Sequence, residues 1–294
     1  MRRAMRRAPW VLIAFVLLVP TRADAACGVK PARAEYETPE VQVYARGSKL
    51  LACHRATRRE RQVGVRVNDG MGTDESSYVS GIVGRRWLWT TMHASFAESP
   101  DVREDTLTDL RTGDSVTVGN EEADVVALPG MLVFASDEGV TAHFSDRRPV
   151  ERLSAEPASH PAGAGARLYW TEGTTVARTR VFTLPAGDPP RPRPLARTVG
   201  RCAPRRGARL ILRDGNLVVS RAAGATWACR GTKQRRVSDS PEVTALTPRH
   251  LLHPGGVFSV SDGRRRTLEG AEPATDLTTR YWLDGAGVPQ RADF

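Results

Sequence analysis

The sequence predicts an all-β protein, a β-propeller of six or seven four-stranded blades, and three observations lead to this fold. The apolar runs are short, rich in Val, Leu, Thr, Tyr and Trp, and bounded by Gly, Asp, Asn or Pro, as is typical of strands and turns. Beyond the first 25 residues, no window keeps a helical period for three turns. A similar cysteine-bounded unit occurs twice, which indicates a repeat protein.

The first 25 residues read as an export signal. Four arginines precede an uninterrupted apolar run over residues 10–19, and Ala23-Asp24-Ala25 offers a small-x-small cleavage site. A run of ten residues is too short for a permanent span, which needs about 20. Cys27 raises a lipoprotein alternative, but Asp24 stands where a lipid-attachment signal has a branched apolar residue. We therefore predict a signal peptide over 1–25 and a propeller domain over 26–294, secreted or held at the cell envelope or in the periplasm.

The expected strands follow one another along the whole remaining chain. They cover residues 41–45, 63–67, 87–92, 116–118, 125–128, 132–135, 168–170, 181–184, 210–212 and 257–260. Strand-and-turn units recur at about 40 residues, so about 269 residues hold six or seven of them. We expect units to begin near 27, 76, 120, 156, 199 and 240, with a short last unit from about 271. An N-terminal strand could complete that last unit and so close the ring, which removes exposed edges.

Two cysteine-bounded hairpins match each other. Cys27 and Cys53 lie 26 residues apart, Cys202 and Cys229 lie 27 apart, and both hairpins end in Ala-Cys. Cysteines of an exported protein are normally paired, and the duplication favours Cys27 with Cys53 and Cys202 with Cys229 among three possible connectivities. A zinc or redox cluster is disfavoured because there is no C-x-x-C spacing.

The basic charge is spread along the chain. Of the net charge of +10, the leader accounts for +4, and only three of the 43 basic residues are lysines. The arginines gather in scattered, turn-like clusters rather than in one stripe, which argues against a nucleic-acid partner. Solvated turn arginines explain them best, and weak attraction to an anionic envelope polymer or membrane face is the alternative.

Three sequence features together resemble a known group of proteins. These are Asp-Leu-Arg-Thr-Gly at 109–113, the Tyr-Trp-x-x-Gly pairs at 169–173 and 281–285, and the Ala-Cys hairpins. In them the chain is similar to the uncharacterised secreted β-propellers of high-G+C bacteria, which have TolB-like and WD40-like repeats. The resemblance implies a scaffold or binding role and supplies no catalytic residues.

No motif of nucleophilic, metal or nucleotide chemistry is present, so we predict no catalytic, cofactor-binding or metal-binding residues. His250 and His253 are three apart and would point to opposite faces of a strand, which makes a shared metal unfavourable. The acidic, glycine-rich stretch 68–75 misses the spacing of a calcium loop and is better explained as a solvent turn.

The tryptophans and carboxylates leave two functional alternatives. Five tryptophans recur in the predicted units: Trp87, Trp89, Trp170, Trp227 and Trp282. Packing between blades explains their rings best, although two of them exposed together could stack on a sugar. The leading hypothesis is a non-catalytic, monomeric propeller that binds a protein or an envelope polymer. The alternative is a polysaccharide hydrolase or lyase with Asp69, Asp74 or Asp137 at a central channel.

The proline-rich stretch 185–194 is the clearest candidate for a linker, although one closed domain is preferred.

Overall fold

The computed structural model describes residues 34–68, 73–96, 99–119, 123–146, 148–173, 176–183, 193–194, 202–203, 205–247, 249–268 and 270–293. All regular structure in these ranges is β, which confirms the predicted class. Among the residues described, no helix is long and apolar enough to cross a membrane. The predicted leader lies outside the described residues, and so do Cys27, Asp69 and most of the proline-rich stretch.

Consecutive antiparallel strands form units of three or four. The N-terminal half holds β1 (Tyr36–Glu37), β2 (Val41–Arg46), β3 (Lys49–His54), β4 (Arg59–Asn68), β5 (Thr73–Val83), β6 (Trp87–Phe96), β7 (Ser99–Asp109), β8 (Ser115–Gly119), β9 (Asp124–Leu128), β10 (Met131–Ser136), β11 (Gly139–Phe144), β12 (Glu151–Ser154), β13 (Ala158–Ala164), β14 (Arg167–Glu172) and β15 (Val176–Val181). The C-terminal half holds β17 (Arg209–Asp214), β18 (Leu217–Ala222), β19 (Ala225–Arg230), β20 (Lys233–Ser238), β21 (Thr244–Thr247), β22 (His250–His253), β23 (Gly256–Ser259), β24 (Arg265–Arg266), β25 (Ala271–Thr275), β26 (Thr279–Leu283) and β27 (Pro289–Asp293); the short β16 (Arg193–Pro194) pairs with β17.

The strand β10 shows why short apolar runs suffice for this fold. Leu132 and Phe134 pack against the β5–β8 unit, whereas Val133 and Ala135 face the β13–β15 unit. Because successive side chains of a strand point to opposite faces, an unbroken apolar run is expected where both faces are covered. Gly139 ends the turn to β11 with a φ of +116°, and a Cβ there would lie 2.3 Å from the Ser154 carbonyl oxygen. Only glycine fits at this position.

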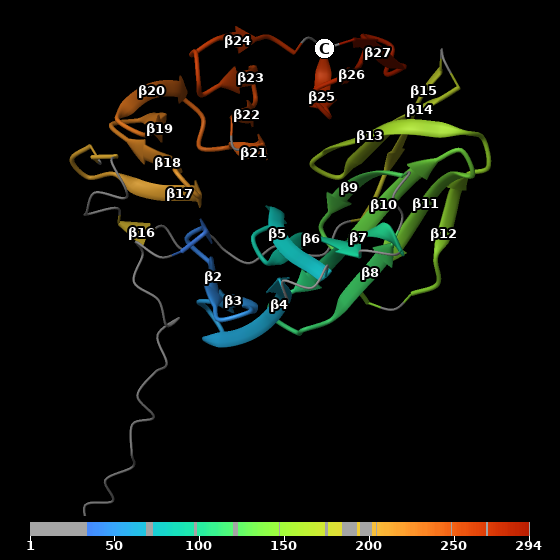
Figure 1. Ribbon diagram of the computed structural model, residues 1–294. Coiled ribbons are helices and arrows are strands. Elements are labelled where there is room, and N and C mark those ends of the chain that lie inside the picture. Colours follow the sequence, from blue (N-terminus) through green and yellow to red (C-terminus); the bar gives the residue numbers. More distant parts are fainter. Residues whose placement is uncertain are drawn as a thin grey trace, which may run out of the picture.

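The units surround a common centre in a propeller-like arrangement (Figure 1). Apolar side chains fill the seams between neighbours: β1–β4 packs on β5–β8, β5–β8 on β9–β12, and β9–β12 on β13–β15. A further apolar cluster joins β17–β20 to β21–β24. The unit starts predicted near 76, 120, 156, 240 and 271 all lie within four residues of a unit's first strand.

The order of the units differs from that of the predicted propeller. A propeller has separate blades in chain order, but here β17 pairs with β1, and the β25–β27 unit packs on β13–β15. The described strands therefore form five sheets, of which the largest has 13 strands and joins β17–β20 through β1 to β8. Sequence spacing indicates how long a unit is, but it does not specify which unit covers an open edge. The free edge of β1 is covered by β17 rather than by the last unit.

The two cysteine hairpins match strand for strand. Cys53 on β3 pairs with Gln42 on β2, and Cys229 on β19 pairs with Val218 on β18, so both cysteines hold the same place in the register. Continuing outward, Ala52 pairs with Arg61 on β4, and Ala228 pairs with Arg235 on β20. The β1–β4 and β17–β20 units are thus equivalent, as the duplicated sequence predicts.

This equivalence extends to the following units. Gly113 follows β7 and Gly263 follows β23; each has a positive φ and donates its amide four residues back, to Asp109 and Ser259 respectively. A Cβ on Gly113 would overlap the guanidinium of Arg61, and one on Gly263 would overlap that of Arg235. In both halves, therefore, the glycine turn leaves room for an arginine from the preceding unit.

The junction between the halves lies at the centre of this duplication. Counting along the matched hairpins, Glu37 on β1 corresponds to Arg213 on β17, and these two residues are directly paired across the junction. The antiparallel β1–β17 ladder is therefore approximately symmetric about a twofold axis through that pair. Both side chains are buried, and the Glu37 carboxylate accepts a hydrogen bond from Arg55 at 2.6 Å.

The Cys202–Cys229 disulfide is confirmed, with the two Cα atoms 5.9 Å apart. It lies among Leu210 and Val218, inside the β17–β20 unit. Cys53 is also disulfide-bonded, and Cys27, its predicted partner, lies outside the described residues.

The halves meet again at their last units, where the duplicated Tyr-Trp pairs lie. The rings of Tyr169 and Tyr281 stack at 5.6 Å, and burial raises the pKa of Tyr281 to about 12. The Tyr281 hydroxyl donates to the His160 carbonyl at 2.8 Å and lies 2.7 Å from Thr171 Oγ1. These residues fix the second seam between the halves.

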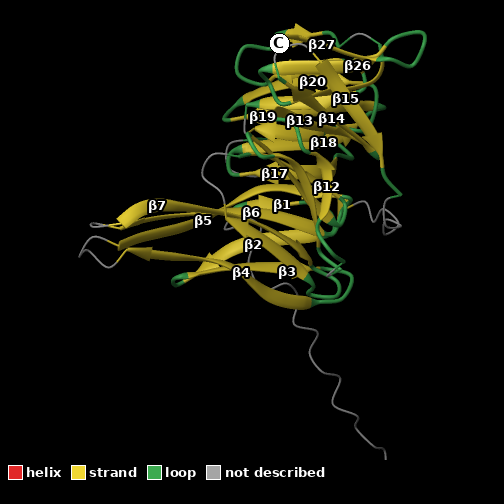
Figure 2. Cartoon of the chain, turned by 90° about the vertical axis from the view of Figure 1, so that its right-hand side faces the viewer, coloured by secondary structure: helices red, strands yellow, loops and turns green. Residues whose placement is uncertain are grey.

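One feature extends beyond the rest of the molecule. Strands β5, β6 and β7 have 10 or 11 residues each, and their outer parts project as an arm (Figure 2). At about 3.3 Å per residue such strands reach roughly 35 Å. The root of the arm lies at the centre of the molecule, beside β21.

Replacing both Cys202 and Cys229 with serine is expected to lower the free energy of unfolding. In the chain-entropy model, opening a loop of 27 residues costs about 3.5 kcal/mol. Urea denaturation of the variant and the wild type measures the difference. An unchanged midpoint at an unchanged slope would contradict the structural role of this bridge.

Tyr281→Phe is expected to destabilise the fold by about 1–3 kcal/mol, because it leaves the half-buried His160 carbonyl and the buried Thr171 hydroxyl without their partner. Tyr78→Phe is the matched control, since Tyr78 is 44% exposed and should change stability by less than about 0.5 kcal/mol. Thermal unfolding of both variants checks the prediction, which is wrong if they unfold alike.

Candidate functional site

A hollow of about 540 Å³, here called the junction crevice, opens where the two halves meet. It lies beside the β1–β17 ladder, between the arm root and β21. Residues of all these segments line it: Glu35, Tyr36, Tyr78, Val79, Ser80, Trp89, Asp214, Gly215, Ala245, Leu246 and Thr247. The crevice is thus built by residues that are far apart in the sequence, and it exists only when the halves are joined.

One wall is a fixed polar network on the arm. The register between β5 and β6 shifts around Ser80, and such a bulge re-aims side chains. Ser80 Oγ lies 2.6 Å from Thr91 Oγ1, which donates to the Asp105 carboxylate at 2.5 Å. The same carboxylate, which is 1% exposed, accepts the indole N–H of Trp89 at 2.7 Å. The orientation of the Trp89 ring is therefore set by a buried acid.

Tyr78 supplies the exposed aromatic surface of this wall. The residue is 44% exposed, and its ring lies parallel to that of His93, with centroids 5.6 Å apart. The hydroxyl also lies 3.0 Å from His93 Nε2. Two contacts thus hold an exposed ring in place at the crevice.

The opposite wall carries the charge. The Glu35 carboxylate forms a bidentate pair with Arg66, at 2.6 and 2.7 Å. Asp214 is half-buried, and within the described part of the chain its carboxylate has neither an ion pair nor a hydrogen bond. Burial raises the pKa of Asp214, and its negative charge adds to the burial that raises the pKa of the neighbouring Tyr36. Asp214 is therefore an unmatched, partly desolvated carboxylate.

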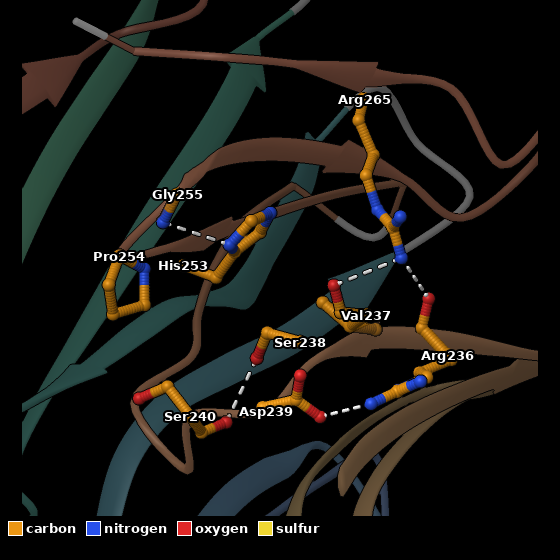
Figure 3. Close-up of a pocket in the computed structure, with 9 residues that line it drawn as sticks. All are labelled: Arg236, Val237, Ser238, Asp239, Ser240, His253, Pro254, Gly255 and Arg265. Atoms are coloured by element: carbon orange, nitrogen blue, oxygen red, sulfur yellow. Dashed lines mark hydrogen bonds and ion pairs between the residues drawn. The ribbon is translucent and has the colours of Figure 1, made fainter.

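A second hollow, of about 500 Å³, lies beside β20 and the β22–β24 strands (Figure 3). Its polar groups mostly bind each other: Arg265 donates to the carbonyls of Arg236 and Val237, and Arg236 is paired with Asp239. Burial and the nearby Arg265 lower the pKa of His253, which favours a neutral imidazole. These bonds hold the seam between two units together, so this hollow is the weaker candidate.

His250 and His253, for which the sequence makes a shared metal unfavourable, each bind within their own local turn. His250 Nδ1 lies 3.1 Å from Thr247 Oγ1, and His253 Nδ1 accepts the Gly255 amide at 3.1 Å, so both rings belong to local turns. No group of three His, Cys, Asp or Glu side chains placed to hold a metal occurs among the described residues. Residues 69–72, half of the acidic stretch 68–75, lie outside them.

A third cluster has the composition of a catalytic triad but a different geometry. His160 Nδ1 lies 2.9 Å from Asp276 Oδ2 and 3.1 Å from Thr278 Oγ1. A working triad engages the acid and the hydroxyl through different ring nitrogens, whereas here both contact the same one. The His160 backbone has a φ of +54° and donates its amide to Asp124. The cluster therefore ties the last units of the two halves together.

The tryptophans pack within and between units, as predicted. Trp87 and Trp170 are 1% and 4% exposed and lie in seam clusters, while Trp89, Trp227 and Trp282 are half-buried. A sugar-stacking platform needs at least two exposed rings together, and none of these five residues is exposed, so the structure does not favour that alternative.

The carboxylates proposed from the sequence are not those of the crevice. Asp74 lies on the arm, paired with Ser95, and Asp137 lies in the exposed turn between β10 and β11. The crevice instead contains Glu35 and Asp214, neither of which stands out in the sequence. Asp214 followed by Gly215 reads as an ordinary turn, and its position becomes informative only once β17 is paired with β1.

Comparison with known proteins gives little to add to this geometry. No protein-family model matches the chain, and no curated protein matches it. Among solved structures, a chain of the crystal structure of the mitotic checkpoint complex is similar to this one. The match covers 97% of this chain and 90% of that chain, at 10% sequence identity and a TM-score of 0.28. The AfRom2 CNH domain covers 88% and 80% at 7% identity and a TM-score of 0.24. The tricorn protease covers 86% of this chain and 35% of its own at 11% identity and a TM-score of 0.22. Likenesses this distant do not bear on function.

Asp214→Asn is expected to raise the free energy of unfolding at pH 7. The pKa of Asp214 is higher in the folded than in the unfolded chain, so its ionised form costs stability above that pKa. The cost disappears as pH falls, and the two proteins should converge below about pH 4. Urea denaturation at pH 7 and pH 4 measures both. A variant less stable than the wild type at pH 7 would show that the carboxylate has a stabilising partner.

Proposed function

We propose that the chain is an exported, non-catalytic interaction module that binds a protein partner or an envelope polymer at the junction crevice. The observation that carries this proposal is the exposed Tyr78 ring, held by His93 beside a hollow of about 540 Å³. Rigid aromatic side chains at such positions are the usual anchors of binding surfaces.

The construction of the wall supports binding rather than packing alone. The hydroxyls of Ser80 and Thr91, and the Trp89 indole, are linked through the buried Asp105. A network anchored in this way keeps polar groups in fixed directions, which lowers the entropy lost on binding. The arm root therefore offers a preorganised surface to a partner.

Export is supported by the covalent chemistry of the chain. The Cys202–Cys229 disulfide persists in oxidising compartments and is rare in reducing ones. The leader-like segment 1–25 gives the route, and we propose a secreted or envelope-bound location on these two grounds.

One observation favours a second function, cleavage of a polysaccharide. Glu35 and Asp214 line the same hollow; the raised pKa of Asp214 suits a general acid, and Arg66 pairs with the Glu35 carboxylate. Release of reducing or unsaturated ends from a polysaccharide panel, lost in Asp214→Asn, would favour this function over binding alone.

Tyr78→Ala tests the binding proposal, with Val181→Ala as the matched control. Val181 is 58% exposed and lies at the end of β15, outside the residues that line the crevice. The probes are a synthetic peptide array and a panel of soluble peptidoglycan fragments and anionic polysaccharides. We expect the probes bound by the wild type to bind Tyr78→Ala about tenfold more weakly, and Val181→Ala normally.

The proposal fails if both variants bind every captured probe as the wild type does. It also fails if a bound polymer is consumed, since the chain would then be an enzyme.

A further inference from the structure

We infer that the junction crevice recognises a cationic side chain of a protein partner, a lysine or an arginine, with the Asp214 carboxylate as its counterion. This inference rests on the proposed function and specifies the chemistry of the ligand. Its first support is that Asp214 is a half-buried carboxylate without an ion pair or hydrogen bond in the described part of the chain. Such a group costs stability, and no interaction with a residue that the structure describes offsets that cost.

The neighbouring charges all have partners, which leaves Asp214 as the open one. Glu35 pairs with Arg66, and Glu37 pairs with Arg55 at 2.6 Å. Arg213 donates from Nε to the Gly215 carbonyl and interacts electrostatically with Glu37. An incoming cation would therefore meet one unmatched negative charge rather than compete for an existing ion pair.

The backbone holds this carboxylate in a fixed place. Asp214 is paired with Tyr36 on one side and with Leu217 on the other, and the next amide, of Gly215, donates to the Glu35 carbonyl at 2.7 Å. Asp214 is thus the last residue of a strand that has a neighbouring strand on each side, at the junction of the halves. A partner's charge would meet a preorganised counterion.

The aromatic rings that share the crevice suit the same ligand. Tyr78 and Trp89 line it together with Asp214, and the face of each ring attracts cations. The Trp89 N–H is already bound to Asp105, so the indole has no donor left for a carbonyl or a sugar hydroxyl. A carboxylate with two aromatic rings is a setting for an ammonium or a guanidinium.

The charge of the whole chain makes this selection specific. The full sequence has a net charge of +10, and about +6 is left once the +4 of the predicted leader is subtracted, so the overall field repels basic partners. A basic segment can dock only where a local acid outweighs that field, which restricts it to sites such as the crevice.

The test uses the full mature chain and acetylated, amidated pentapeptides in which glycines flank one central arginine, lysine, citrulline or glutamate. Chemical-shift titration should show arginine and lysine peptides perturbing residues of the crevice, and the neutral isostere citrulline binding about tenfold more weakly. Asp214→Asn should lower arginine-peptide affinity by a similar factor. Asp137→Asn, which alters an exposed turn outside the crevice, should leave it unchanged.

Equal binding of arginine and citrulline peptides, or full affinity in Asp214→Asn, overturns the inference. The proposed function survives that result if Tyr78→Ala still abolishes binding of a neutral peptide or polymer. If neither Asp214→Asn nor Tyr78→Ala changes any binding, both proposals fail. Binding of an amino-sugar polymer but of no peptide also overturns the inference, because the cation would then belong to a glycan.

Discussion

Two residues of β1 pair with two residues of β17, and this short antiparallel ladder joins the halves of the molecule. Through it, strands from residue 36 to residue 119 and from residue 209 to residue 238 become one sheet. Glu37, at the centre of the ladder, is 2% exposed and bound to Arg55 at 2.6 Å. Because removing one member of a buried ion pair leaves an isolated charge, the junction is strongly sensitive to change at this point.

The same ladder creates the candidate site. It brings Tyr36 and Glu35 beside Asp214, while the second unit of each half supplies a side wall, β5 from one and β21 from the other. Binding at the crevice and joining of the halves are therefore coupled. A ligand held there contacts both halves and should stabilise the joined form by mass action.

Much of the fold follows from local sequence signals. Strands bounded by turn glycines, the length of each unit, and the matched hairpins ending at Cys53 and Cys229 are all readable, because they depend on residues close together in the chain. The neighbour of each unit is not readable in this way. Tyr36 pairs with Asp214 because the open edge of β1 is covered by β17. Which edge strand pairs with which depends on the shape of whole units and not on a sequence motif.

The site was less predictable for the same reason. The tryptophans stand out by composition yet serve mainly in seams, whereas Tyr78, an ordinary strand residue in the sequence, is the exposed ring. Asp214 looks like a turn residue, and only the structure shows that it is half-buried and paired with Tyr36 of the opposite half. A site whose residues come from segments far apart in the sequence has no local motif by which it could be predicted.

The position of β17 also dictates the order of events during synthesis. Residues 36 and 214 lie 178 positions apart, so the nascent N-terminal half is complete long before its edge partner leaves the ribosome. Until then β1 presents open backbone groups that could recruit a strand from another nascent chain. Contacts between residues so far apart in the sequence also slow folding. Assembly of the halves is therefore expected to be the late step, and the one most prone to failure, in the folding of this protein.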